Sequence, residues 1–298
     1  MITYYKRKIK DKKIKKLKGF ETGCWIKVVN PTKEEIKFLV DRFKLDEQNL
    51  VSGLDENEVP RVEFDNNNIY IFVKTISDKG QQFLNTCLIL ISDKFILTLS
   101  SEEPKFIKDY YKLITTQKFK VLIKFLLNIS EGFEKETLKI VKIVNKVKNT
   151  AKEMKEKDLI ILLQQEDKLN YLIFSYQYLI LIYEKLLKTI EFFKEDREIM
   201  EDLVISSTQG LNMCKSSLKT ISNIRNYQTI MLSNKINKTM AILTIFMAFL
   251  GISTTITGFY GMNVKLPFQN IPNIYAYIIL SILISGFILF FYLLRTKI

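Results

Sequence analysis

The chain of 298 residues contains no histidine and only three cysteines, which lie far apart at Cys24, Cys87 and Cys214. Zinc sites built from cysteine and histidine pairs, and catalytic arrangements in which histidine is the base, are therefore excluded. An odd number of isolated cysteines provides no disulfide framework and fits a reducing compartment. No glycine-rich phosphate loop is present. We therefore expect a protein that is not an enzyme.

Charged residues are missing from two long stretches near the C-terminus. Residues 241–260 and 275–294 each run for twenty residues without a charged side chain. At about 1.5 Å rise per residue, such a helix covers about 30 Å, the thickness of a bilayer hydrocarbon core. Residues 261–274 form a short connection between them. The pattern predicts two transmembrane helices arranged as a hairpin.

Basic residues flank this hairpin on one side. They are Arg225, Lys235 and Lys238 before the first span and Arg295 and Lys297 after the second, whereas the connection holds only Lys265. The positive-inside rule then puts both termini in the cytoplasm and residues 261–274 outside, with residues 295–298 as a cytoplasmic tail. We expect a multi-pass protein of the inner (cytoplasmic) cell membrane.

The formal net charge of +13 is concentrated near the N-terminus, where residues 6–18 hold nine basic residues and one acid, Asp11. Such a run is compatible with nucleic-acid binding. No recognised nucleic-acid module accompanies it, and beside two membrane spans a solvated or lipid-facing basic tail is favoured. We expect no nucleic-acid partner.

The first hundred residues carry the signals of an α+β domain, which we assign to residues 1–104. Thr32 and Glu35 form a predicted capping box that starts a helix ending at Phe43. Residues 23–29 predict a strand around Trp25. Residues 61–64 with 69–76, and residues 86–91 with 95–99, predict two antiparallel hairpins.

Proline is absent between Pro104 and Pro267, and apolar residues recur there at helical spacing. We predict helices over residues 105–156, 158–192 and 196–260, with a break in the first left open near Gly132. Residues 105–195 then form long antiparallel cytoplasmic helices. Residues 196–240 form a stalk helix that is continuous with the first span, 241–260.

A coiled-coil spacing marks the stalk, where Leu211, Cys214, Leu218 and Ile221 are three or four residues apart. Two partners fit this stripe equally well. It could pack against copies of the same helix in an oligomer, or against the two preceding helices of its own chain.

One face of the first span mixes amide, thioether and hydroxyl groups. Its residues are Asn237, Met240, Leu243, Met247, Gly251 and Thr254. Several copies with this face inward would enclose a narrow pore without fixed charge, whereas bulky residues such as Ile242, Ile245 and Phe249 suit lipid or the second span. Alternatively, Ser253, Thr254, Thr255 and Thr257 simply bond back to helix carbonyls.

The tripeptide Gly261-Met262-Asn263, preceded by Tyr260 at the outer end of the first span, resembles the signature of the CorA magnesium-transporter family. The resemblance covers the whole predicted architecture, from the α+β domain through the stalk helix to the second span. Residues 59–63 before the first hairpin also look like the family's cytoplasmic domain.

The resemblance implies a funnel-shaped homopentamer that conducts Mg²⁺, and also Co²⁺ and Ni²⁺. Gly261, Met262 and Asn263 would select the hydrated ion at the outer mouth, above the six pore-lining positions given above. Mg²⁺ dehydrates reluctantly, so uncharged oxygens can hold it without removing its waters. The family also senses cytoplasmic Mg²⁺ between subunits, which implies metal-binding roles for Asp202, Glu201 and Asp78. Alternatively, these are solvent-facing acids on a charged surface.

The chain departs from the family pattern in its outer loop, where Leu266-Pro267-Phe268-Gln269 replaces the usual Met-Pro-Glu element and no acid is present. Two other functions stay open. A zinc transporter of the same superfamily is disfavoured because zinc prefers nitrogen and sulfur ligands. A membrane-anchored helical scaffold would use the spans only as anchors.

Overall fold

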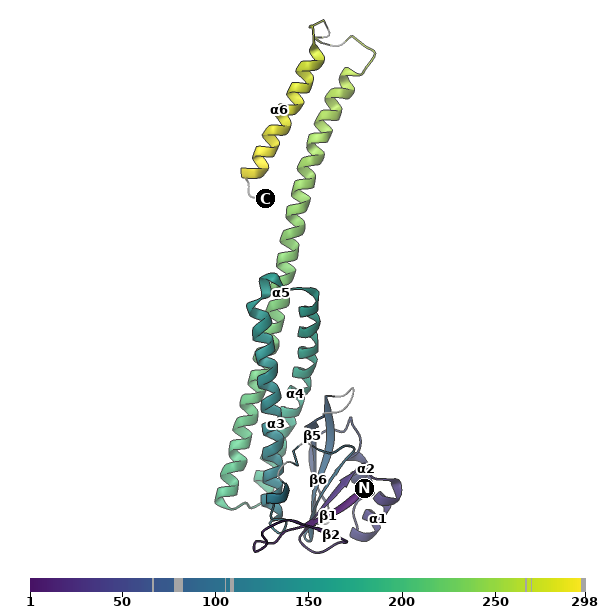
Figure 1. The fold of residues 1–298 in the computed structure, drawn as a ribbon, viewed down its shortest axis with the longest axis vertical. Helices are drawn as coiled ribbons and strands as arrows, with labels where there is room; N and C mark the ends of the chain where they lie inside the picture. The colour runs from purple at the N-terminus through teal and green to yellow at the C-terminus, as the bar shows by residue number, and fades with distance from the viewer. Residues whose placement is uncertain are drawn as a thin grey trace. The chain divides into compact units, whose positions relative to one another are not determined.

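The computed structural model describes residues 1–65, 67–77, 83–104, 106–107, 110–265, 267–268 and 270–295. The chain divides into two compact units, Met1–Ser222 and Asn223–Ile298. The boundary falls within helix α5 (Lys194–Tyr260), which contributes residues to both units (Figure 1).

The described part of the first unit contains a seven-stranded sheet. The strands lie in the order β2 (Lys15–Leu17), β1 (Ile2–Lys6), β3 (Cys24–Val29), β7 (Phe95–Ser100), β6 (Leu84–Ile91), β5 (Asn68–Ile76) and β4 (Arg61–Asp65). Neighbouring strands are antiparallel except β3 and β7, which are parallel. The predicted hairpins correspond to β4–β5 and β6–β7 and are confirmed.

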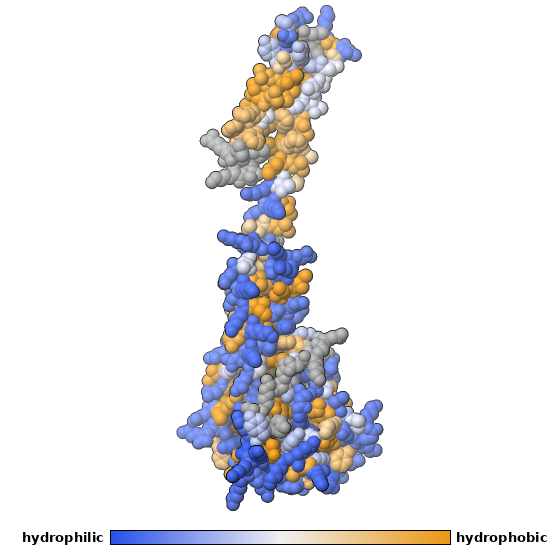
Figure 2. Space-filling model, viewed as in Figure 1, coloured by the Kyte–Doolittle hydropathy of each residue, from blue (hydrophilic) through white to orange (hydrophobic). Residues whose placement is uncertain are grey.

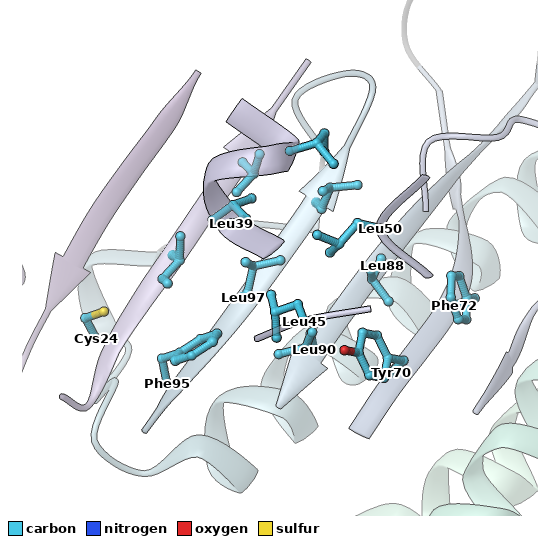
Figure 3. Packing of buried hydrophobic residues seen from close by; sticks show 14 residues of the cluster. Cys24, Leu39, Leu45, Leu50, Tyr70, Phe72, Leu88, Leu90, Phe95 and Leu97 are labelled. Atoms are coloured by element: carbon cyan, nitrogen blue, oxygen red, sulfur yellow. The ribbon is translucent and has the colours of Figure 1, made fainter. Parts of the chain in front are cut away.

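Both faces of this sheet are covered, because side chains alternate between them along each strand. On one face, α1 (Lys33–Phe43) and α2 (Glu47–Ser52) place Leu39 and Leu50 over Leu88 and Leu97 (Figure 3). The predicted capping box at Thr32 and Glu35 starts α1 and is confirmed.

The other face of the sheet packs against α3 (Lys118–Asn149). The ring of Trp25 lies 5.6 Å from that of Phe125, and its indole N–H donates to Thr98 Oγ1 at 3.0 Å. Because the indole donor is satisfied, burying this large side chain costs no unpaired polar group. Trp25 therefore links the strand predicted around it to the first long helix.

The long helices differ from the prediction at their ends. The first was predicted over residues 105–156, but α3 begins only at Lys118, after a 3₁₀ turn, η1 (Tyr110–Lys112). The intervening Thr115 is fully buried, accepting from Arg7 N at 3.0 Å and donating to Gly23 O at 2.7 Å. These bonds hold the segment against the sheet. No break occurs at Gly132, and α3 ends at Asn149 before η2 (Ala151–Glu153).

Helix α4 (Glu156–Thr189) and the first part of α5 lie alongside α3 (Figure 1). A buried stripe on α5 repeats every three or four residues and consists of Met200, Leu203, Ser207, Gly210, Cys214, Ser217 and Ile221.

Hydrogen bonds tie these three helices together. Thr137 Oγ1 of α3 lies 3.1 Å from the Tyr176 hydroxyl of α4 and 3.7 Å from Cys214 Sγ of α5. Burial raises the pKa of the Cys214 thiol, so the thiol stays neutral. Of the two partners considered for the predicted stripe, the structure supports the intramolecular one for Cys214 and Ile221.

The basic N-terminal run was predicted to be a solvated or lipid-facing tail. Most of its lysines are exposed, but it is not a tail, because parts of it belong to the sheet. Lys6 at its start is the last residue of β1, and Lys15–Leu17 within it form β2 at the edge of the sheet. Lys6 pairs with Glu21 at 2.6 Å, and Lys15 lies 3.7 Å from Asp11. Exposed lysines along an edge strand discourage pairing with another sheet, which provides a structural reason for the charge.

The second unit contains the C-terminal part of α5 and helix α6 (Ile274–Arg295). Both helices are long and apolar enough to cross a membrane, and Figure 2 shows α6 coloured mainly as hydrophobic. They meet at Gly286, where an added Cβ would lie 3.0 Å from Phe249 Cε2. This glycine lets the two backbones approach, as small residues do between membrane helices.

Candidate ion pathway and metal-binding residues

The predicted pore face of α5 points away from α6. Within residues 241–260, the half-buried positions of α5 are Ala241, Ile245, Phe249, Ser253, Ile256 and Tyr260. Met247 is two residues, or about 200° of helix rotation, from both Ile245 and Phe249. The face that contacts α6 is thus nearly opposite the predicted pore face. The expectation that Ile245 and Phe249 suit the second span agrees with this packing.

The predicted pore positions are uncovered in the single chain. Met240, Leu243 and Met247 are 55%, 43% and 62% exposed. No heavy atom lies within 4 Å of a Cβ placed on Gly251, apart from its own helix backbone and adjacent residues. A face of this kind, on a helix apolar enough to enter a membrane, must be covered by lipid or by other protein.

The hydroxyl groups of the span divide into two kinds. Ser253, Thr255 and Thr257 donate to Phe249 O, Gly251 O and Ser253 O at 2.9, 2.7 and 3.0 Å. For these three side chains the alternative that they bond back to the helix is confirmed.

Thr254 is the exception. In the described part of the chain its hydroxyl has no hydrogen-bond partner. It is exposed, and it lies on the same face as Met247 and Gly251. Its oxygen is therefore free to contact water or a hydrated ion.

The Gly-Met-Asn tripeptide begins directly after α5 ends at Tyr260. Gly261 N donates to Thr257 O at 3.0 Å, and Met262 N lies 3.4 Å from Phe259 O, so both residues continue the last helical turn. Asn263 is exposed, and within the described ranges its carboxamide has no hydrogen-bond partner. The tripeptide therefore presents an uncommitted amide at the end of the predicted pore face.

The three predicted metal-binding acids do not form a site in the single chain. Glu201 is paired with Arg197, whose Nε lies 2.9 Å from Glu201 Oε1. Asp202 is exposed on α5 and has no ion pair or hydrogen bond to another described residue. Asp78 lies outside the described residues. No group of three or more potential metal ligands occurs among the residues that the structure describes.

Chemically, the arrangement offers uncharged oxygens and thioethers in the membrane unit and, among the predicted metal-binding acids, the unpaired carboxylate of Asp202 on the first unit. Gly286 was not singled out from the sequence as the contact point of the two membrane helices. The adjacent small residues Ser285 and Gly286 within an apolar run are the signal that could have identified it.

Comparisons with known proteins agree on one family. The model of the CorA-like Mg²⁺ transporter proteins matches residues 20–295. A cobalt/magnesium transport protein CorA of Methanocaldococcus jannaschii is 27% identical over 291 residues, covering 91% of this chain and 89% of the relative.

Solved structures show the same fold. The complete CorA magnesium transporter of M. jannaschii matches with a TM-score of 0.86 and 24% identity, covering 99% of this chain and 98% of that chain. The cytoplasmic domain of ZntB from Vibrio parahaemolyticus matches with a TM-score of 0.66 and 8% identity, covering 78% of this chain and 98% of that chain. At these identities the structural likeness supports the fold alone.

Proposed function

The chain belongs to the CorA-like Mg²⁺ transporter family, and from this premise we propose that it is a homopentameric channel for divalent cations, chiefly Mg²⁺. Co²⁺ and Ni²⁺ are the expected further substrates. The observation that carries the proposal is the position of Gly261-Met262-Asn263, directly after the first of two helices that can cross a membrane. The M. jannaschii relative is a cobalt/magnesium transport protein, which supports Mg²⁺ and Co²⁺ as substrates.

In the proposed assembly, five copies of α5 surround a water-filled axis. The stalk continues into the first span, and the face opposite α6 points inward. Asn237, Met240, Leu243, Met247, Gly251 and Thr254 then line the pore. The free hydroxyl of Thr254 and the exposure of Met247 support this orientation, because neither is used within the chain. A hydrated Mg²⁺ ion would pass without meeting a fixed charge.

At the outer mouth, we propose that five Asn263 amides and Gly261 carbonyls hold the hydrated ion as it enters. Neutral oxygens suit an ion that keeps its waters. Lys265 lies in the same loop and would oppose the concentration of cations there. Both termini lie in the cytoplasm in this proposal, and the membrane is the inner cell membrane.

For regulation, we propose that cytoplasmic Mg²⁺ bridges Asp202 of one subunit and Asp78 of the next. Glu201 has a weaker role because Arg197 already pairs with its carboxylate. Bound ions would offset carboxylate repulsion and favour the closed state, so loss of cytoplasmic Mg²⁺ would shift the population toward the open state. Asp202→Lys should therefore reduce the protection that Mg²⁺ gives the cytoplasmic domain against protease. Unchanged protection would remove Asp202 from the site.

The transport proposal is tested by Asn263→Ala in proteoliposomes loaded with a Mg²⁺-sensitive dye. We expect Mg²⁺ uptake to be abolished while assembly is unchanged by size-exclusion chromatography. Asn270→Ala, a change of the same residue type in the same loop, is the matched control and should conduct normally. Normal uptake by Asn263→Ala would point to a scaffold. Zn²⁺ uptake by the unaltered protein without Mg²⁺ uptake would favour a zinc carrier.

A further inference from the structure

A cavity of about 230 Å³ lies in the first unit, between the start of α3 and the start of α5. One wall is formed by Gln117 and the first turn of α3, and the other by residues 191–193 and Asp196. None of the described residues proposed for transport or sensing lines this cavity. Nothing in the proposed transport function uses this cavity.

Among the residues that line this cavity, Asp196 is the one that indicates a bound ligand. The residue as a whole is only 7% exposed, and its carboxylate has no hydrogen bond or ion pair with any other described residue. Its place in the first turn of α5 is near the positive end of a helix dipole, but no backbone N–H donates to it. Because Asp196 lines the cavity and its carboxylate has no protein partner among the described residues, a cationic group in the cavity can pair with it.

The opposite wall of the cavity, at the start of α3, has a positive electrostatic potential. Gln117, at the N-cap of the 32-residue helix α3, makes no side-chain capping bond, and the first turn holds no acid. Lys118 in that turn instead donates to the carbonyl oxygens of Ser92 and Asp93. The unsatisfied N–H groups at a helix N-terminus attract anions, and the exposed Lys120 adds to the positive potential.

Aromatic side chains supply the rest of the lining. The rings of Phe119 and Phe192 lie 6.0 Å apart in an edge-to-face arrangement, and Phe193 is 82% exposed beside them. Phenyl rings bury apolar groups and also favour an ammonium group placed over them. A metal ion would use the carboxylates of Asp196 and Glu191, which both line the cavity, and would leave the aromatic lining and the α3 N-terminus unmatched.

From these three features we propose that the cavity binds a small zwitterion with the chemistry of an amino acid that has an apolar side chain. The ammonium group pairs with Asp196, the carboxylate lies at the first turn of α3, and the apolar body contacts Phe119 and Phe192. The site is independent of the transport proposal, because it needs neither the pore nor a second subunit.

Isothermal titration of the detergent-solubilised full chain tests this proposal, with L-leucine as the probe. We expect leucine to bind, and 3-methylbutylamine and 4-methylpentanoate to bind at least about tenfold more weakly, since each lacks one of the two charges. Absence of leucine binding, or equal binding of the amine alone, would overturn the proposal.

Two variants locate the site. Asp196→Asn should weaken leucine binding by about tenfold or more, whereas Glu198→Gln should not change it. Glu198 is exposed on the same turn of α5 but does not line the cavity. Equal binding by Asp196→Asn and the unaltered chain would contradict the assignment. The analogue series on the unaltered protein keeps the test decisive even if Asp196→Asn does not fold.

Discussion

Residues 200–221 and 240–254 belong to the same helix, yet their side chains have opposite surroundings. In the first stretch, a stripe of small and apolar residues is buried against α3 and α4. In the second, the corresponding spacing produces a face that no other part of the described chain covers. Helical periodicity is thus the same in both, and only the partner differs: its own chain for the first stretch, and lipid or other copies for the second.

Two glycines of α5, Gly210 and Gly251, show this difference most clearly. A Cβ on Gly210 would lie 2.4 Å from Tyr176 Cζ, whereas a Cβ on Gly251 would have no neighbour within 4 Å. Tyr176 cannot easily move, because it is buried and its hydroxyl is bonded to Thr137. The first glycine is therefore required for packing within the chain, and the second is not.

The largest effect on stability should come from Gly210→Ala. We expect it to destabilise the first unit by about 1–3 kcal/mol through overpacking, despite the gain in helix propensity. The melting temperature of the solubilised protein checks this. Gly251→Ala is the matched control and should leave the melting temperature unchanged or slightly higher.

The same experiment can separate packing from propensity. In a Tyr176→Leu background the obstructing ring is gone, so Gly210→Ala should become neutral or stabilising. If Gly210→Ala were harmless in the unaltered chain, the close packing of α5 against α4 would be contradicted.

A smaller effect is expected from Thr254→Val, which removes the one hydroxyl of the span's serine and threonine cluster that has no partner in the described chain. Mg²⁺ uptake in proteoliposomes should fall a few-fold, because one polar contact for the hydrated ion is lost at each subunit. Thr255→Val is the control, since Thr255 already donates to Gly251 O at 2.7 Å. Equal uptake by the two variants would place Thr254 outside the pore.

Local signals in the sequence predicted much of the fold. The capping box at Thr32 and the two hairpins depend on residues close together in the chain, and both are confirmed. Strands β1 and β2 pair with each other across a short connection, and they were missed because lysines dominate the composition of the segment. Spacing alone could not tell that Cys214 contacts Thr137 rather than another subunit.

The candidate site was predictable only in part. The helical face that contains Met247 follows directly from the spacing of its residues. Spacing could not distinguish Thr254 from Thr255, because that difference depends on which carbonyl each hydroxyl reaches. It also could not reveal that Arg197 pairs with Glu201, or that Asp196 is buried without a partner.

Disulfide formation at Met247 tests most directly whether copies of the chain meet along this face. The native Cys24, Cys87 and Cys214 are buried, so a new cysteine in the span would be the accessible one. After mild oxidation in membranes, Met247→Cys should run as a dimer on a denaturing gel, and Ile242→Cys, on a different face, should stay monomeric. Monomeric Met247→Cys together with dimeric Ile242→Cys would contradict the account.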